Sequence, residues 1–341
     1  MNEQNRTSVG TEEPPIIEVR DLVVHYETDA GIVEAVNDVS FSIRRGETLG
    51  LIGETGAGKT SIALSIMRLL PTPPAHVIQG EVFLNGESLS ELTPAQMRKV
   101  RGKKISMIFQ DPMSALNPVH KIGNQVAEVI RLHQHLGQTE AYAKALEMLQ
   151  LVGIPASRAG EYPHEFSGGM KQRVVIAIAL ACEPELIIAD EPTTALDVTI
   201  QAQILDLMRE LRQRLNTSML LITHDFGVVA EMCERCAVMY AGEIVELGTV
   251  EQIFENPLHP YTVGLFESLP DLERDTERLK PIKGLMPNPM DLPAWCSFAD
   301  RCGQCGNQCM EKDPALREME PGHFVRCLRY EEGKECRHEK A

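Results

Sequence analysis

The chain has 341 residues, of which 43% are hydrophobic, enough for about two domains of ~150 residues with cores of their own. Its 33 basic and 49 acidic residues give a formal net charge of −16, the wrong sign for a protein whose main ligand is nucleic acid. The longest apolar run, residues 174–182, has nine residues, whereas a membrane span needs roughly 20, and no apolar signal segment opens the sequence. These features argue against a membrane-spanning or low-complexity chain, and we expect a soluble protein of the cytoplasm.

The N-terminal third of the sequence is predicted to be rich in strands. Residues 1–15 are polar and contain two prolines, which predicts a flexible tail. Alternating or continuous apolar stretches predict strands at 17–26, 39–44, 47–52 and 104–109, and a hairpin at 81–89. A glycine-rich loop at 53–60 opens into a helix that Pro71 ends, because apolar residues recur there at helical spacing (Ala63, Ile66, Met67 and Leu70).

The rest of the chain divides into three stretches. Residues 112–182 show helical periodicity without strand signals, which indicates an inserted helical subdomain. Predicted strands then alternate with predicted helices, a pattern typical of a mostly parallel sheet with helices on both faces, so the fold class is α/β (strands 186–189, 219–223 and 236–240; helices 200–215 and 226–234). We place this domain at 16–255 and treat the proline-punctuated residues 256–341 as a second module.

A phosphate-binding loop is predicted at the end of the strand at 47–52. The segment fits G-x-x-x-x-G-K-[ST] and lies between a predicted strand and a predicted helix, the context that distinguishes it from a chance glycine-rich turn. Its glycines let backbone N–H groups turn toward phosphate, Lys59 would lie between the β- and γ-phosphates, and the Thr60 hydroxyl would be a ligand of Mg²⁺. The residues that we expect to bind nucleotide here are Gly53, Glu54, Thr55, Gly56, Ala57, Gly58, Lys59, Thr60 and Ser61.

Two carboxylates end the predicted strand at 186–189. A buried strand end is an unfavourable place for charge unless a cation or a reacting water requires it. Asp190 is therefore a candidate to hold Mg²⁺, and Glu191 to orient and deprotonate the attacking water. In the structural alternative, Asp190 caps a helix and Glu191 is solvated. The presence of a phosphate loop in the same sequence disfavours that alternative.

Together these segments resemble the ATP-binding subunits of ATP-binding-cassette (ABC) transporters. Residues 166–172 (FSGGMKQ) are similar to the signature of that family, and Ser167, Gly168 and Gly169 lie where a helix N-terminus could offer N–H groups to an anion, or where Ser167 is an ordinary helix cap. Gln110, Asp197 and His224 match its glutamine loop, D-loop and switch histidine, and Tyr26 its adenine-stacking aromatic.

The resemblance implies a P-loop NTPase with a RecA-like parallel sheet core, an antiparallel β subdomain and the inserted helical subdomain. It also implies that Gln110 completes the Mg²⁺ shell with Thr60 and Asp190, and that His224 contacts the γ-phosphate and Glu191. In the family the signature of one subunit closes over ATP held by another. Because this chain carries one loop and one signature, two complete sites require two chains.

Within the family, residues 109–118 and 256–262 resemble the oligopeptide and dipeptide importers. That resemblance implies two transmembrane permeases, an extracytoplasmic peptide-binding protein and a peripheral place on the cytoplasmic face of the inner membrane. Alternatives are import of another small solute, such as nickel or glutathione, and a soluble cassette ATPase, which usually has two cassettes or a coiled-coil insertion. A degenerate cassette that binds ATP without hydrolysing it is a further alternative, and Glu191 argues against it.

Five of the nine cysteines lie within 32 residues near the C-terminus, and four of these, Cys296, Cys302, Cys309 and Cys327, match a cysteine pattern of the importers that implies a [4Fe–4S] cluster. From the residues alone, a cluster, zinc and unligated thiols all stay open, whereas disulfides do not suit a cytosolic compartment. Cys305 stands where the family has a small residue and could substitute for a neighbour. Cys233 and Cys236 read as core-filling residues, and Cys336 lies in a charged tail.

Overall fold

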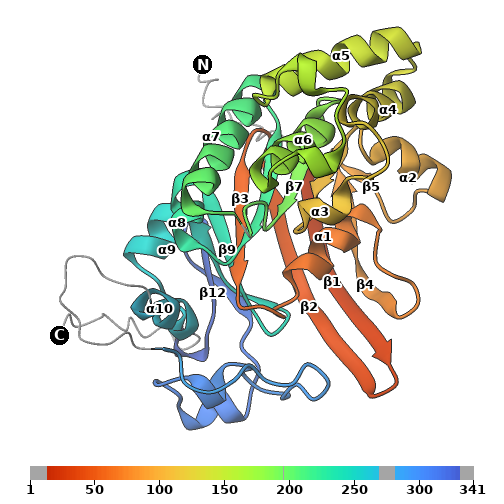
Figure 1. Ribbon diagram of the computed structural model, residues 1–341. Helices are drawn as coiled ribbons and strands as arrows, with labels where there is room; N and C mark the ends of the chain where they lie inside the picture. Colours follow the sequence, from red (N-terminus) through yellow and green to blue (C-terminus); the bar gives the residue numbers. More distant parts are fainter. Residues whose placement is uncertain (1–13, 195, 269–280, 331–341) are drawn as a thin grey trace, which may run out of the picture.

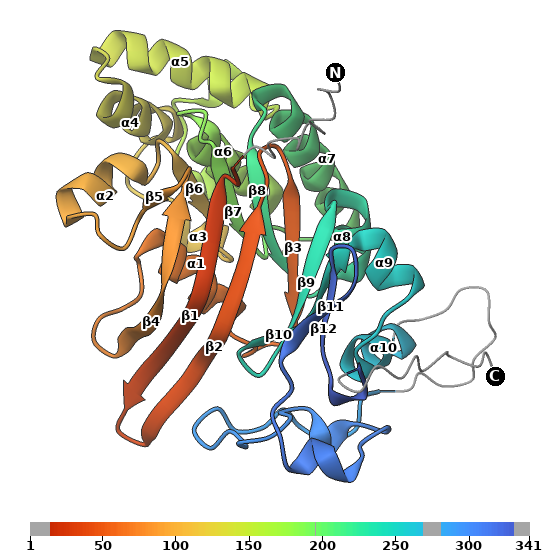
Figure 2. The ribbon, with the colours of Figure 1, turned by 180° about the vertical axis from the view of Figure 1, so that it is seen from behind.

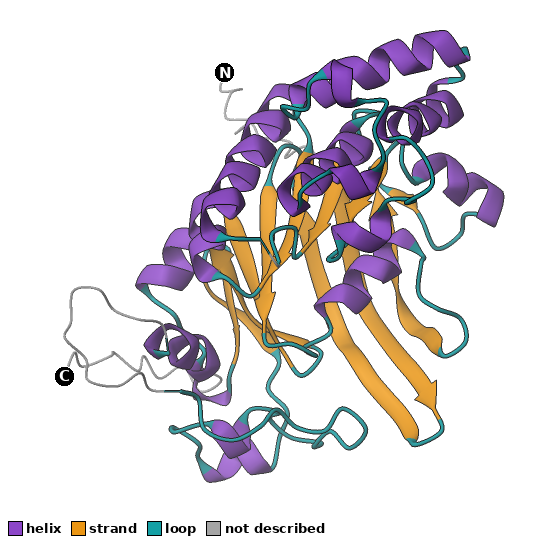
Figure 3. Cartoon of the chain, viewed as in Figure 1, coloured by secondary structure: helices purple, strands orange, loops and turns teal. Residues whose placement is uncertain are grey.

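The computed structural model describes residues 14–194, 196–268 and 281–330. Most of the predicted tail, Ala195 of the D-loop and Cys336 lie outside these ranges. Two β-sheets form the frame of the molecule, and helices cover the larger sheet (Figure 1, Figure 2 and Figure 3). In the described part of the chain no helix is both long and apolar enough to cross a membrane.

The smaller sheet is antiparallel, with the strand order β2-β1-β4-β5. Its long hairpin turns at residues 29 and 30, and Val39, Phe41 and Ile43 point into the core while their neighbours are more exposed, as the alternating pattern predicts. The predicted hairpin at 81–89 is also present, since Leu84 pairs with Glu87. The strands are β1 (Ile17–Thr28), β2 (Gly31–Ile43), β4 (Ala75–Leu84) and β5 (Glu87–Ser88).

Among the described residues, the larger sheet has eight strands in the order β11-β12-β10-β9-β3-β8-β7-β6. Its five strands from β9 to β6 are parallel and buried on both faces, which is why they read as continuous apolar runs. These parallel strands were predicted, whereas β10 and the strands after it were not. The bounds are β3 (Thr48–Gly53), β6 (Ile105–Ile108), β7 (Leu186–Asp190), β8 (Ser218–Thr223), β9 (Arg235–Tyr240), β10 (Glu243–Thr249), β11 (Leu316–Glu320) and β12 (His323–Arg326).

Helices pack on this sheet and build the predicted helical region between β6 and β7. Helix α1 ends at Met67, where Arg68 takes a left-handed conformation, so Leu70 lies beyond the helix that we predicted to reach Pro71. The α-helices are α1 (Lys59–Met67), α2 (Pro94–Val100), α3 (Pro112–Ala115), α4 (Ile122–Gln134), α5 (Gln138–Leu151), α6 (Gly168–Leu180), α7 (Val198–Leu215), α8 (Phe226–Met232), α9 (Val250–Glu255) and α10 (Pro260–Glu267).

The C-terminal residues have more regular structure than their composition predicts. Strand β12 pairs with β10, so that β11 and β12 extend the sheet of the preceding domain. A buried contact fixes this pairing, because Nε2 of His323 lies 2.9 Å from a carboxylate oxygen of Glu246. The same carboxylate accepts the backbone N–H groups of Leu258 and His259 before α10. One side chain of β10 thus joins three segments of the C-terminal half.

Candidate functional site

The loop between β3 and α1 has the shape that its sequence predicts. Gly58 has a φ of 97°, and a Cβ there would lie 2.2 Å from the carbonyl oxygen of Ala35, so that only glycine fits. Helix α1 starts at the next residue, which aims the positive end of its dipole and its free N–H groups into the loop. The loop is therefore arranged to receive an anion.

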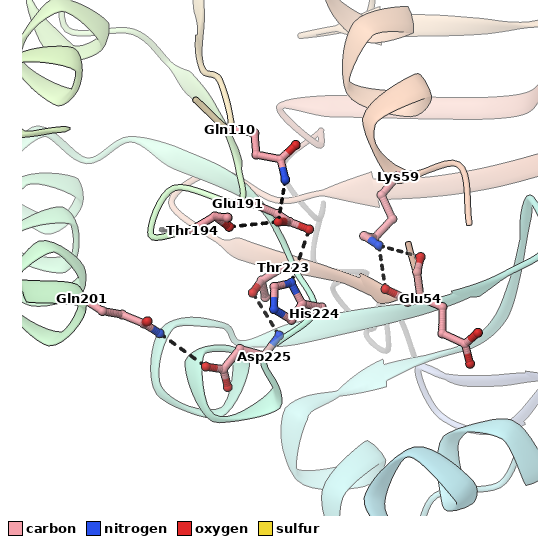
Figure 4. Close-up of polar contacts among 10 residues, drawn as sticks. Glu54, Lys59, Gln110, Glu191, Thr194, Gln201, Thr223, His224 and Asp225 are labelled. Carbon is pink, nitrogen blue, oxygen red and sulfur yellow. Dashed lines mark hydrogen bonds and ion pairs between the residues drawn. The ribbon is translucent and has the colours of Figure 1, made fainter. Parts of the chain in front are cut away.

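Lys59 is the buried cation of this loop. Its Nζ donates hydrogen bonds to the carbonyl oxygens of Gly53 at 2.6 Å and Glu54 at 2.9 Å (Figure 4). Burial lowers the pKa of Lys59, while the charges of Glu191 and Asp190 act in the opposite direction. The ammonium group is held at the position where negative charge would be neutralised.

Asp190 and Glu191 follow each other at the end of β7 but meet different surroundings. Asp190 is buried, and burial raises its pKa, although a hydrogen bond from the Thr60 hydroxyl opposes that shift. The two oxygen groups thus meet beside the loop, and such hard oxygen ligands suit Mg²⁺. Glu191 has a φ of 45°, an unusual conformation for a residue with a side chain, which turns its carboxylate toward the site.

Three side chains hold the Glu191 carboxylate (Figure 4). Gln110 Nε2 and Thr194 Oγ1 each donate to Oε2 at 2.9 Å, and His224 Nδ1 lies 3.3 Å from Oε1. Burial favours a higher pKa for Glu191, but the bonds from Thr194 and His224 and the charges of His224 and Lys59 outweigh it and lower the pKa. The carboxylate is consequently ionised at neutral pH and able to accept a proton.

Lys59, Gln110, Glu191 and His224 line one open cavity of about 320 Å³. Gln110 and Thr194 both contact Oε2 of Glu191 beside the cavity. Thr194 was not predicted, because a single threonine after a strand matches no motif. Tyr26 lies beside the cavity, with its hydroxyl 3.0 Å from Oγ of Ser61. The lining residues are Ala35, Thr55, Gly56, Gly58, Lys59, Thr60, Ser61, Gln110, Glu191 and His224.

The predicted signature lies elsewhere, at the start of α6. Ser167 is the N-cap, and its hydroxyl accepts the N–H of Met170, while a Cβ on Gly169 would lie 2.5 Å from a methyl group of Ile200 in α7. Asp197 caps α7 by accepting the N–H of Ile200. Ser167, Gly168, Gly169 and Asp197 do not line the cavity of this chain. The single chain keeps its two candidate anion sites apart.

The four predicted cluster cysteines line a different, small cavity of about 10 Å³. Burial raises the pKa of Cys296 to about 12 and that of Cys327 to about 11, and it also raises the pKa of Cys302, so these three thiols are protonated at neutral pH. Within the described ranges no group of three or more metal-ligating side chains is spaced to hold a metal ion, and no disulfide joins the cysteines. The four cysteines therefore line one cavity, but they are not arranged as the ligands of a metal ion.

Comparison with known proteins decides the family. A family model described as ABC transporter matches residues 36–194, and one described as the C-terminal region of oligopeptide/dipeptide transporters matches 245–309. A relative from Sinorhizobium fredii named "Probable peptide ABC transporter ATP-binding protein" is 51% identical over 320 residues, 93% of this chain and 96% of its own. The chain belongs to the ATP-binding subunits of the oligopeptide and dipeptide ABC transporters.

Further matches support both the subfamily and the fold of this cassette. The oligopeptide transport ATP-binding protein OppD of Bacillus subtilis is 48% identical over 91% of this chain and 88% of its own. A solved dimer of the ATP-binding cassette MJ0796, in a post-hydrolysis state bound to ADP and Pi, is 27% identical and superposes with a TM-score of 0.62 over 69% of this chain and 98% of that one. The P-loop cassette fold with mixed sheets, predicted above, is confirmed.

Proposed function

We propose that this subunit hydrolyses ATP to energise the import of dipeptides and oligopeptides through a membrane ABC transporter. The observation that carries the proposal is the Glu191 carboxylate, ionised and held by Gln110, Thr194 and His224 at the cavity that Lys59 and the phosphate loop form. A carboxylate in that place can take a proton from a water that attacks the terminal phosphate.

The chain's own residues divide the work of hydrolysis. Tyr26 stacks on adenine, the loop N–H groups and Lys59 offset phosphate charge, and His224 contacts the γ-phosphate while it orients Glu191. Mg²⁺, which Thr60, Asp190 and Gln110 would hold, supplies further neutralisation of the developing charge when bound. Glu191 accepts the proton of the attacking water.

The second part of the proposal concerns partners. Ser167, Gly168, Gly169 and Asp197 lie away from the cavity of their own chain, which supports their use on ATP bound by a second cassette. ATP binding then brings two cassettes together and hydrolysis separates them. A related cassette, two permeases and an extracytoplasmic peptide-binding protein complete the assembly, with this subunit peripheral on the cytoplasmic face of the inner membrane.

Substitution of Glu191 tests the catalytic part of this proposal. In the complex purified from its own membrane, Glu191→Gln keeps the side-chain shape but removes the base, and we expect ATP hydrolysis to fall at least about 100-fold while ATP binding persists. The matched control is Glu183→Gln, a glutamate outside the cavity, which is expected to hydrolyse ATP normally. Wild-type hydrolysis by Glu191→Gln would refute the assignment.

For the C-terminal cysteines we propose a [4Fe–4S] cluster held by Cys296, Cys302, Cys309 and Cys327. Their convergence on one cavity and the Cys305 side chain's exposure support this choice of four thiols. Because the cavity has room for about one water molecule, the surrounding loops must open to admit a cluster. The bound cluster would hold the four cysteine side chains as thiolates. It would also join segments of the C-terminal region whose helices and strands are short.

Anaerobic purification tests the cluster. We expect a brown protein that absorbs at about 400 nm and contains about four iron atoms per chain. Cys327→Ser should lose both properties, and Cys305→Ser should keep them. Colourless protein that contains zinc, or iron retained by Cys327→Ser, would contradict the proposal.

A further inference from the structure

The C-terminal part of the chain forms hydrogen bonds with the phosphate loop at Glu54. Its backbone N–H donates to the hydroxyl of Tyr261 at 3.1 Å, and its carboxylate accepts two hydrogen bonds from Arg301 at 3.1 and 3.2 Å. Its carbonyl oxygen accepts the bond from Lys59 described above. Figure 4 shows this carboxylate pointing away from Lys59 and Glu191, so that Arg301 binds the outer side of the loop.

Arg301 is itself firmly placed. Its side chain is only 6% exposed, and it also donates to the hydroxyl of Tyr240 at 3.3 Å and to the carbonyl of Lys283 at 3.2 Å. The guanidinium lies 5.6 Å from the ring centre of Tyr240, whose ring packs on Tyr261. A buried arginine with a two-pronged carboxylate partner and several further contacts has little freedom to move.

The C-terminal part also lies against Gly56 of the loop and against β2. A Cβ built on Gly56 would lie 3.3 Å from Cε of Met286, and the carbonyl oxygen of Pro289 accepts the N–H of Glu34 at 2.8 Å. In Figure 1 and Figure 2 the C-terminal segment, drawn in blue, lies at the end of the molecule toward which β3 points. The C-terminal part therefore contacts the loop at Gly56 as well as at Glu54.

We propose that Arg301 and Tyr261 are positioning residues for ATP, which hold the phosphate loop in its anion-binding conformation through Glu54. The inference rests on the proposed ATPase function and extends its machinery into the C-terminal region. A loop whose N–H groups are already oriented binds phosphate without first losing conformational freedom. Loss of the contacts that Arg301 and Tyr261 make with Glu54 should therefore weaken ATP binding. Both residues contact the loop, and neither lines the cavity.

The test compares steady-state ATP hydrolysis by the purified complex. We expect Arg301→Ala to raise KM for ATP about tenfold, or about 1.4 kcal/mol, with kcat changed less than about threefold. Tyr261→Phe should raise KM as well, since it leaves the Glu54 N–H without its acceptor, and Arg301→Lys should give an intermediate KM. Because Arg301 acts through Glu54, the double variant Arg301→Ala with Glu54→Gln should match Arg301→Ala within about twofold.

The matched control is Arg326, a second buried arginine of the C-terminal region, which pairs with Glu243 at 3.2 Å and does not contact the loop. Arg326→Ala should lower the melting temperature as Arg301→Ala does, yet keep KM for ATP within about twofold of wild type. Equal KM values in Arg301→Ala and wild type, or a KM raised equally by both arginine substitutions, would overturn the inference. Failure of the wild-type complex to hydrolyse ATP would instead refute the proposed function.

Discussion

At the scale of single residues, the surroundings of Glu191 decide what its carboxylate can do. Its neighbour Asp190 is buried with a raised pKa, whereas hydrogen bonds and positive charge hold the pKa of Glu191 low. The two adjacent carboxylates thereby suit different tasks. Asp190 lies beside the Thr60 hydroxyl as a candidate Mg²⁺ ligand, and Glu191 is an ionised base. The difference arises from the partners of each side chain and not from residue type.

Thr194 provides a test of this account. Thr194→Ala removes a hydrogen bond that lowers the Glu191 pKa, so that pKa rises toward its ordinary value. Because the base works only when ionised, the acid limb of the plot of kcat against pH should move to higher pH, whereas kcat at neutral pH, where the carboxylate stays ionised, should change less than about twofold. Thr194→Ser keeps the hydroxyl and should retain the wild-type profile. An unshifted acid limb in Thr194→Ala would count against the assignment.

At the scale of elements, the N-termini of three helices do the positioning. Helix α1 presents the phosphate loop, and α6 and α7 begin at Ser167 and Asp197, whose side chains cap them. Helix capping alone could account for the presence of Ser167 or Asp197. A role on the nucleotide of a second cassette must therefore be tested with a variant that keeps the helix cap.

Asp197 allows that separation. Asparagine caps a helix as well as aspartate, so Asp197→Asn should keep the free energy of unfolding, whereas Asp197→Ala should lower it by ~1 kcal/mol. We expect Asp197→Asn to reduce ATP hydrolysis by the complex about fivefold, because it loses the charge that would act across the dimer. Urea unfolding and steady-state hydrolysis measure the two effects. Full ATP hydrolysis by a stable Asp197→Asn variant would show that Asp197 acts only as a helix cap.

At the scale of the whole molecule, the C-terminal part is joined to the main sheet through Glu246 and His323, both fully buried. His323→Ala leaves the carboxylate without its ring partner and should lower the free energy of unfolding by about 3 kcal/mol. His76→Ala breaks a pair with Glu27 that lies exposed at the surface, and should change stability little. Equal stability of the two variants in urea unfolding would show that the buried contact does not fix β12.

The sequence predicted the elements whose signals are local. The loop at 53–60, the parallel strands and the helix start at Ser167 follow from glycine spacing, continuous apolar runs and a capping residue. Strand β12 was missed because it has only four residues and joins the main sheet by pairing with β10, about 80 residues earlier, as well as with β11. Arg301 and Tyr261 were missed for the same reason, since their contacts with Glu54 join residues more than 200 positions apart.

Peptide uptake tests the central claim most directly. The complex is purified from its own membrane with its peptide-binding protein, reconstituted into vesicles, and supplied with ATP on the side of the cassettes and a labelled peptide on the other. We predict ATP-dependent accumulation of peptide with the wild-type chain and none with Glu191→Gln. Hydrolysis of ATP by the wild-type complex with accumulation of nickel or glutathione, and none of peptide, would contradict the account.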